Sequence, residues 1–134
     1  MAYGIDLSAS ARRHLEAAHV LYDDEKRRDV AGYVYGIAAE CAVKAMMREA
    51  GMQPLTKDKR REDPFYAHFP ELKTLLRDLP LGRRGTTLMK FIENPNFMSQ
   101  WDTDMRYCKG DDINRNWVDR WRNQAKDVVG AIGT

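Results

Sequence analysis

The chain has few cysteines, a small net charge and no long apolar run. Its 134 residues include two cysteines, Cys41 and Cys108, which lie far apart and do not have the spacing of metal ligands. We therefore expect two free thiols and a reducing compartment. The formal net charge is only +2, so the overall composition does not indicate a nucleic-acid-binding protein. Any such function requires a local basic patch.

Signals for export, membrane insertion and several kinds of catalytic site are also missing from the sequence. The first ten residues have neither the basic start nor the apolar stretch of a signal peptide. No apolar run approaches the roughly 18 residues that a membrane span needs. No catalytic triad, Gly-rich phosphate loop or zinc-ligand spacing is present. These absences predict a cytoplasmic protein without membrane contact, resident metal or cofactor.

What the sequence does contain is helical periodicity. Hydrophobic residues make up 43% and charged residues 31%, an ordinary composition for one globular domain over residues 1–134. The clearest pattern lies in residues 29–51, between a suitable N-cap, Asp29, and a suitable C-terminal glycine, Gly51. Its apolar residues recur every three or four positions and predict one buried helix face: Val30, Val34, Ile37, Cys41, Ala45 and Met46.

The same segment is rich in small side chains. Gly32 and Gly36 each cost about 1 kcal/mol relative to alanine in a helix interior. Close approach of another helix would offset this cost, so we expect a central helix that is contacted on more than one side.

Four further segments have helical patterns, at residues 7–24, 69–79, 86–93 and 111–132. Asp6 or Ser8 can cap the first of them. Residues 52–67 form a long loop with Pro54, Pro64 and many charges, and residues 97–110 have no clear period. No segment has a strand pattern. The prediction is an all-α fold, an up-and-down antiparallel bundle of four to five helices.

Three stretches together resemble a known family. They are Arg13–Ala18 in the first helix, Ala31–Ala45 in the central helix, and the pair formed by His68–Leu72 and the dipeptide Arg106-Tyr107. In order and spacing they resemble the HEPN family (higher eukaryotes and prokaryotes nucleotide-binding domains) over most of the chain. The resemblance implies a helical bundle and association with nucleotides or RNA. It also implies a homodimer, which we expect to form through the central small-residue helix or through the last helix. It also implies a nucleotidyltransferase-type protein partner in a toxin–antitoxin system.

The resemblance also implies a candidate catalytic pair, Arg61 and His68. Catalytic HEPN ribonucleases carry an arginine, four to six residues and then a histidine, and six residues separate Arg61 from His68. An arginine can stabilise a pentacovalent phosphorane while a histidine acts as general acid or base at the 2′-OH. The pattern departs from the family at Glu62 and Pro64, and it lies in a mid-chain loop instead of near a late helix.

Glu40 and Lys44 have two alternative interpretations. Their spacing of four residues favours an ion pair on the solvated face of the central helix. Alternatively, Glu40 points inward and needs a cationic partner, because a buried carboxylate is tolerated only when it is paired. Arg106 is then the expected partner, with Tyr107 packed over a polar core or ligand pocket.

A second candidate site is a basic surface. Lysines and arginines concentrate in the long loop and in one later turn: Lys57, Lys59, Arg60, Arg61, Arg83 and Arg84. They can bind phosphate, and Phe65, Tyr66 and His68 can stack against single-stranded bases. The neighbouring acidic residues offset half of this charge, so a solvated loop is the alternative.

The sequence leaves three hypotheses about function. The first is a nucleotide- or RNA-binding module that acts with a nucleotidyltransferase. The second is a metal-independent ribonuclease that uses Arg61 and His68, and the third is a dimeric adaptor without a ligand. His19 has helix-face spacing with Glu16 and Asp23, and we expect this group to be a solvated polar face and not a metal site.

Overall fold

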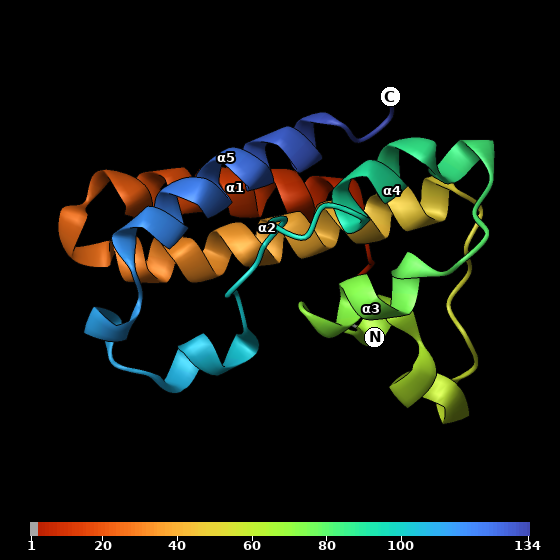
Figure 1. Cartoon of the computed structure of the whole chain (residues 1–134), viewed down its shortest axis with the longest axis horizontal. Helices are drawn as coiled ribbons and strands as arrows, with labels where there is room; N and C mark the ends of the chain where they lie inside the picture. Colours follow the sequence, from red (N-terminus) through yellow and green to blue (C-terminus); the bar gives the residue numbers. More distant parts are fainter. Residues whose placement is uncertain (1–2) are drawn as a thin grey trace.

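The computed structural model describes residues 3–134, and it is helical throughout with no strand in that range. Three long helices form the body of the fold: α1 (Leu7–Asp23), α2 (Arg28–Glu49) and α5 (Arg115–Gly130) (Figure 1). Two helices are short, α3 (Glu71–Arg77) and α4 (Thr86–Ile92). The predicted all-α bundle class is therefore confirmed.

The long helices lie along one another. α1 and α2 form an antiparallel hairpin through a single 3-10 turn, η1 (Glu25–Arg27), and α5 packs against both (Figure 1). α5 runs in the same direction as α2, and α4 lies near the end of the bundle where α2 finishes (Figure 1). Most of the candidate site lies in the segment that connects α2 to α3.

Local signals set the helix ends. Asp6 caps α1 by accepting a hydrogen bond from Ala9 N at 3.0 Å, as predicted. α2 begins two residues earlier than an Asp29 cap predicts, so Asp29 lies in its first turn and does not cap it. Gly51 follows α2 with a φ of 95°, the left-handed conformation that favours glycine just after a helix.

The buried face of α2 agrees with the predicted one only in part. Ala45 and Met46 are buried as predicted, whereas the rest of the expected stripe, from Val30 to Cys41, is exposed or half-buried. In its place the helix buries its small residues together with Tyr35, Val43 and Met47. The reason is that tryptophans from two later segments occupy the space left by the glycines. A Cβ atom on Gly36 would lie 1.9 Å from the indole of Trp101, which is almost fully buried.

These tryptophans account for the small side chains of α2. Trp101 donates a hydrogen bond from Nε1 to Gly32 O at 3.1 Å, and Trp121 packs against Gly32 from α5. The expectation of contact on more than one side is therefore confirmed. The chain's own tryptophans fill the face of α2 that carries Gly32 and Gly36, and a homodimer through this helix stays a prediction.

α2 also has the length and composition of a candidate membrane span. An 18-residue window within Glu25–Glu49 has a mean hydropathy of 1.2, and 72% of that window is buried inside the fold. The sequence prediction that no apolar run approaches the length of a membrane span did not identify this segment. Such burial is typical of a core helix, and a core helix can have the same length and apolar composition as a membrane span.

The segment between α2 and α3 is folded instead of extended. It contains two 3-10 turns, η2 (Lys57–Glu62) and η3 (Pro64–Tyr66), where the sequence predicted a loop without structure. After them Phe69 enters the core and packs edge-on against Phe97 and Trp101, at ring-centroid distances of 5.7 and 6.1 Å. This anchoring places the residues just before Phe69 against α2.

Candidate functional site: a buried carboxylate and a basic loop

Glu40 is the buried charge at the centre of the candidate site. Its side chain is 4% exposed and points from α2 toward the segment that leads into α3. One carboxylate oxygen lies 2.9 Å from His68 Nδ1, and the other accepts a hydrogen bond from Phe69 N at 2.9 Å. Both oxygens of the buried carboxylate therefore have a partner, as burial of a charge requires.

The predicted pairing of Glu40 with Arg106 is wrong. Arg106 is exposed in η5 (Thr103–Tyr107), and its guanidinium lies 5.3 Å from the centre of the exposed Tyr107 ring. Arg106 lines a cavity of about 290 Å³ with Val30 near the start of α2. Glu40 is ten residues further along that helix, about 15 Å at 1.5 Å per residue. The segment before α5 therefore reaches a different part of α2.

Lys44 belongs to the same polar region without forming the predicted ion pair. Over residues 3–134, the single salt bridge within 4.0 Å joins Glu40 to His68. Lys44 is half-buried, and burial lowers the pKa of its amino group, an effect that Glu40, Cys41 and Asp63 oppose. Its ammonium therefore contributes positive charge beside the Glu40 carboxylate.

His68 is held at one nitrogen and open at the other. An ionised carboxylate only accepts hydrogen bonds, so the contact with Glu40 places a proton on Nδ1 of His68. The side chain is 53% exposed, which leaves the remainder of the ring toward solvent. A carboxylate that fixes the tautomer and orientation of an accessible histidine is the arrangement that general acid–base catalysis uses.

Asp63 explains why the loop before His68 is ordered. It is 1% exposed, and its two carboxylate oxygens accept hydrogen bonds from Leu55 N at 2.8 Å and from Phe65 N at 3.0 Å. Our sequence interpretation treated Asp63 only as a charge that offsets its basic neighbours. The available signal was the order Asp63-Pro64, because an aspartate followed by proline is a typical start of a helical turn.

The basic residues of the loop face solvent. Lys57, Lys59, Arg60 and Arg61 are all exposed in η2, and the Arg60 guanidinium lies 4.7 Å from the centre of the Tyr66 ring. Because Asp63 is withdrawn into the fold, four basic residues in this turn are accompanied by two acidic residues, Asp58 and Glu62. The surface of the turn is therefore more positive than its sequence suggests.

The other predicted basic pair lies in η4 (Arg83–Gly85). Arg83 and Arg84 are both exposed, and Arg84 Nη1 lies 3.1 Å from the position of a Cβ atom built on Gly51. Arg84 thus lies beside the C-terminal end of α2, where the backbone carbonyl groups favour a positive charge. This contact places η4 at the end of the bundle where the basic loop begins.

Arg61 and His68 belong to different parts of the folded segment. Arg61 is near the end of η2 and makes no side-chain hydrogen bond within residues 3–134, whereas His68 follows η3 and is fixed by Glu40. Both side chains are exposed to solvent.

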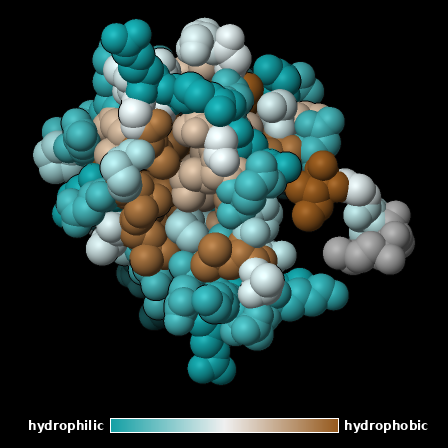
Figure 2. All heavy atoms as spheres, turned by 90° about the vertical axis from the view of Figure 1, so that its right-hand side faces the viewer, coloured by the Kyte–Doolittle hydropathy of each residue, from teal (hydrophilic) through white to brown (hydrophobic). Residues whose placement is uncertain are grey.

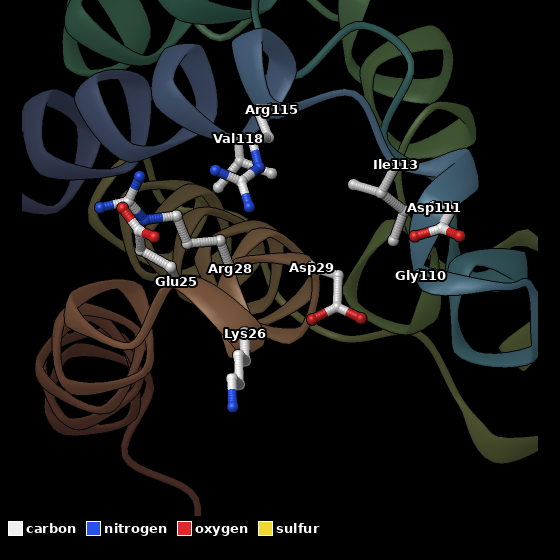
Figure 3. Close-up of a pocket in the computed structure, with 9 residues that line it drawn as sticks. All are labelled: Glu25, Lys26, Arg28, Asp29, Gly110, Asp111, Ile113, Arg115 and Val118. Carbon is white, nitrogen blue, oxygen red and sulfur yellow. The ribbon is translucent and has the colours of Figure 1, made fainter.

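A different cavity, of about 430 Å³, lies between the start of α2 and the start of α5 (Figure 3). Its wall contains three basic and three acidic side chains, with Arg28 and Arg115 reaching in from the two helices (Figure 3). Arg28 already contacts Tyr22. Its Nε donates a hydrogen bond to the Tyr22 carbonyl oxygen at 2.9 Å, and its guanidinium lies over the Tyr22 ring. The balanced charge gives this cavity no preference for an anion.

His19 makes a hydrogen bond within the helix bundle. Its Nδ1 lies 2.6 Å from Tyr35 OH, and burial, together with Arg122 and Lys126, lowers the pKa of His19. Burial also raises the pKa of Tyr35 to about 12. No group of three or more metal-ligating side chains occurs within the described residues. Both cysteines have free thiols, as predicted.

Comparison of the chain with protein-family models, with curated proteins and with solved structures finds no match. Its function is therefore inferred from the basic loop, the buried carboxylate and the exposed imidazole.

Proposed function

We propose that this protein is an RNA- or nucleotide-binding module whose phosphate-binding surface is the loop of residues 57–68. The observation that supports the proposal is the folded basic turn η2, which presents four exposed basic side chains, one of them over the Tyr66 ring. Phosphate groups bind such side chains through charge neutralisation and counterion release.

The order of the loop strengthens this proposal. A flexible segment loses conformational entropy when it binds, and a preorganised segment avoids much of that cost. Asp63 and Glu40 hold the segment at Leu55, Phe65 and Phe69 through buried backbone hydrogen bonds. A loop that served only as a solvated connection would not need two buried carboxylates.

The resemblance to HEPN domains supports the same class of ligand, and it also supports a nucleotidyltransferase-type partner and a homodimer as proposals. In this fold a homodimer must use a surface other than the small-residue face of α2, because Trp101 and Trp121 fill that face. The partly exposed face of α2 and the last helix, α5, remain as the two candidate surfaces for this homodimer.

Charge reversal tests the phosphate-binding surface. A variant with Lys59, Arg60 and Arg61 changed to glutamate should lose at least about tenfold in affinity for a fluorescent single-stranded RNA in an anisotropy titration. The control changes Lys26, Arg27 and Lys109 to glutamate. These three residues are also exposed, and their reversal alters the net charge equally. Equal weakening in both variants would show that the binding depends on net charge and not on this loop.

A second candidate function, a metal-independent ribonuclease, is favoured by the contact between Glu40 and His68. In this reaction the 2′ oxygen attacks phosphorus, the bond from phosphorus to the 5′ oxygen breaks, and a 2′,3′-cyclic phosphate forms. His68 would accept the 2′-OH proton or donate a proton to the leaving 5′ oxygen. Arg61 would stabilise the negative charge that develops on the phosphate oxygens.

The cleavage test uses wild type, His68→Ala and His68→Asn in buffer without metal. Asparagine keeps an N–H donor near the position of Nδ1, so it preserves the contact with Glu40 while removing the imidazole. A ribonuclease should lose cleavage in both variants and in Arg61→Ala. Cleavage that survives in His68→Asn would exclude His68 as the acid or base, and absence of cleavage by wild type would leave the binding function alone.

A further inference from the structure

A cavity of about 580 Å³ opens beside the basic loop, between the N-terminal end of α1, the C-terminal end of α2 and the loop residues Pro54, Phe65 and Tyr66. Part of its wall is apolar, contributed by Ile5 and Leu7 before and within α1, by Ala45 of α2, and by the three loop residues. The rest of the wall is polar and consists of Asp6, Ser8, Arg48 and Glu49. Figure 2 shows the end of the molecule that lies on the right of Figure 1, where apolar residues are visible among hydrophilic ones. The cavity is distinct from the contact between Glu40 and His68, although the same loop forms both.

Several large apolar side chains at this cavity remain open to solvent. Ile5 is 81% exposed and Tyr66 is 47% exposed, and the neighbouring Leu55 is 44% exposed. Burial of such surface against a flat apolar ligand is favourable, and aromatic rings add a stacking contribution. A ligand with an aromatic ring is therefore suited to the cavity.

Tyr66 connects the cavity to the basic loop. Its ring lines the cavity, and the Arg60 guanidinium lies 4.7 Å from the centre of the same ring. A positive charge consequently stands at the rim of an apolar cavity. This combination is complementary to a flat ring that carries a phosphate, whereas an uncharged apolar side chain of a protein partner would gain nothing from Arg60.

Asp63 makes the wall of the cavity rigid. Its two oxygens hold Leu55 N and Phe65 N, which belong to the two arms of the segment on either side of η2. The positions of Phe65 and Tyr66 are thus determined by a buried carboxylate and not by the ligand. A preformed aromatic wall is what a stacking site requires.

We propose that this cavity binds an unpaired nucleobase, so that the preferred ligand of the basic loop is single-stranded RNA. The proposal rests on the proposed function, in which residues 57–61 bind the phosphates. In a duplex the bases are paired and stacked inside the helix and cannot enter a cavity of this kind. The cavity therefore provides a physical basis for distinguishing single-stranded from duplex RNA.

The test compares three ligands of equal length: a short single-stranded RNA, a strand that keeps the phosphates and lacks every base, and an RNA duplex. Wild type should bind the single strand at least about fivefold more tightly than the baseless strand, as expected for the stacking of one base. Tyr66→Ala should remove this preference, and Tyr66→Phe, which keeps the ring, should retain it. Tyr66 is half-exposed, so neither change should prevent folding.

The outcomes separate this proposal from the one on which it rests. If wild type binds all three ligands equally and the reversal of Lys59, Arg60 and Arg61 weakens all of them, the phosphate surface stands and the base site is refuted. If wild type binds none of them, both proposals are refuted. A preference for the single strand that survives Tyr66→Ala would also overturn the assignment of the base to this cavity.

Discussion

Replacement of Glu40 by alanine should destabilise the fold far more than replacement of its histidine partner. Glu40 is almost fully buried, and one of its oxygens is the acceptor for the buried amide of Phe69. His68, in contrast, is 53% exposed, so in His68→Ala water can enter the place of the imidazole and become the partner of the Glu40 oxygen that His68 contacts. Loss of the Glu40 side chain should therefore lower the free energy of unfolding more than loss of the His68 side chain.

The magnitude follows from these two environments. An unsatisfied buried N–H group, here that of Phe69, costs about 1–3 kcal/mol. Loss of the buried methylene groups of Glu40 adds about 1 kcal/mol. We therefore expect Glu40→Ala to lower the free energy of unfolding by about 3 kcal/mol. His68→Ala should lower it by about 1 kcal/mol or less, as for an exposed ion pair.

Urea unfolding followed by circular dichroism measures both values. Glu49→Ala is a matched control, because Glu49 lies on the same helix and accepts from Gly133 N at 3.0 Å, but in an exposed position. The control should lose less than about 1 kcal/mol, since water can replace the carboxylate. Equal losses for Glu40→Ala and Glu49→Ala would refute the conclusion that burial makes the Glu40 contacts important.

Three further changes test the packing and the titrating groups. Gly36→Ala should lower the free energy of unfolding by about 2 kcal/mol, because its Cβ would lie 1.9 Å from Trp101 and overpacking outweighs the gain in helix propensity. In the control Gly130→Ala the added Cβ atom has no neighbour within 4 Å, so this variant should not be destabilised. If urea unfolding shows that Gly130→Ala is the less stable of the two variants, the packing of Trp101 against Gly36 is contradicted. Folded Tyr35 has a pKa of about 12 against 10.0 ordinarily, so the unfolded chain loses this proton first and stability should fall between pH 10 and 12. Tyr35→Phe should flatten that fall in unfolding measurements across pH, and an unchanged slope would exclude Tyr35 as its source. The pKa of Lys44 is lowered by burial, so the unfolded chain binds its proton more tightly and stability should rise as the pH approaches 10.5. Lys44→Met should remove this rise and stabilise the protein at neutral pH, and a destabilised variant would instead show that the ammonium has a favourable partner.

The helices were predictable because their signals are local. Asp6 caps α1 and Gly51 follows α2, and both positions could be read from the sequence. Periodicity alone misplaced most of the buried face of α2, because a hydropathy pattern gives weight to valine and isoleucine. It gives little weight to glycine, which becomes buried at Gly36 only because Trp101, far along the chain, packs there.

The candidate site was only partly predictable for a similar reason. Burial of Glu40 with a partner was one of the two interpretations that the sequence allowed, and His68 was named separately, as a candidate catalytic residue that the family resemblance implies. Their contact joins residues 28 apart in sequence and depends on the path of the loop between them. That path depends in turn on Asp63, whose inward direction cannot be inferred from its position in a charged run.

The salt dependence of RNA binding tests the central claim most directly. For single strands the logarithm of the binding constant falls with the logarithm of salt concentration, with a slope of about −0.7 for each phosphate contact. If Lys59, Arg60 and Arg61 each contact a phosphate, their combined reversal to glutamate should make the slope shallower by about 2. The control reversal of Lys26, Arg27 and Lys109 should leave the slope unchanged. A slope that is the same in wild type and in both variants would contradict the assignment of phosphate binding to this loop.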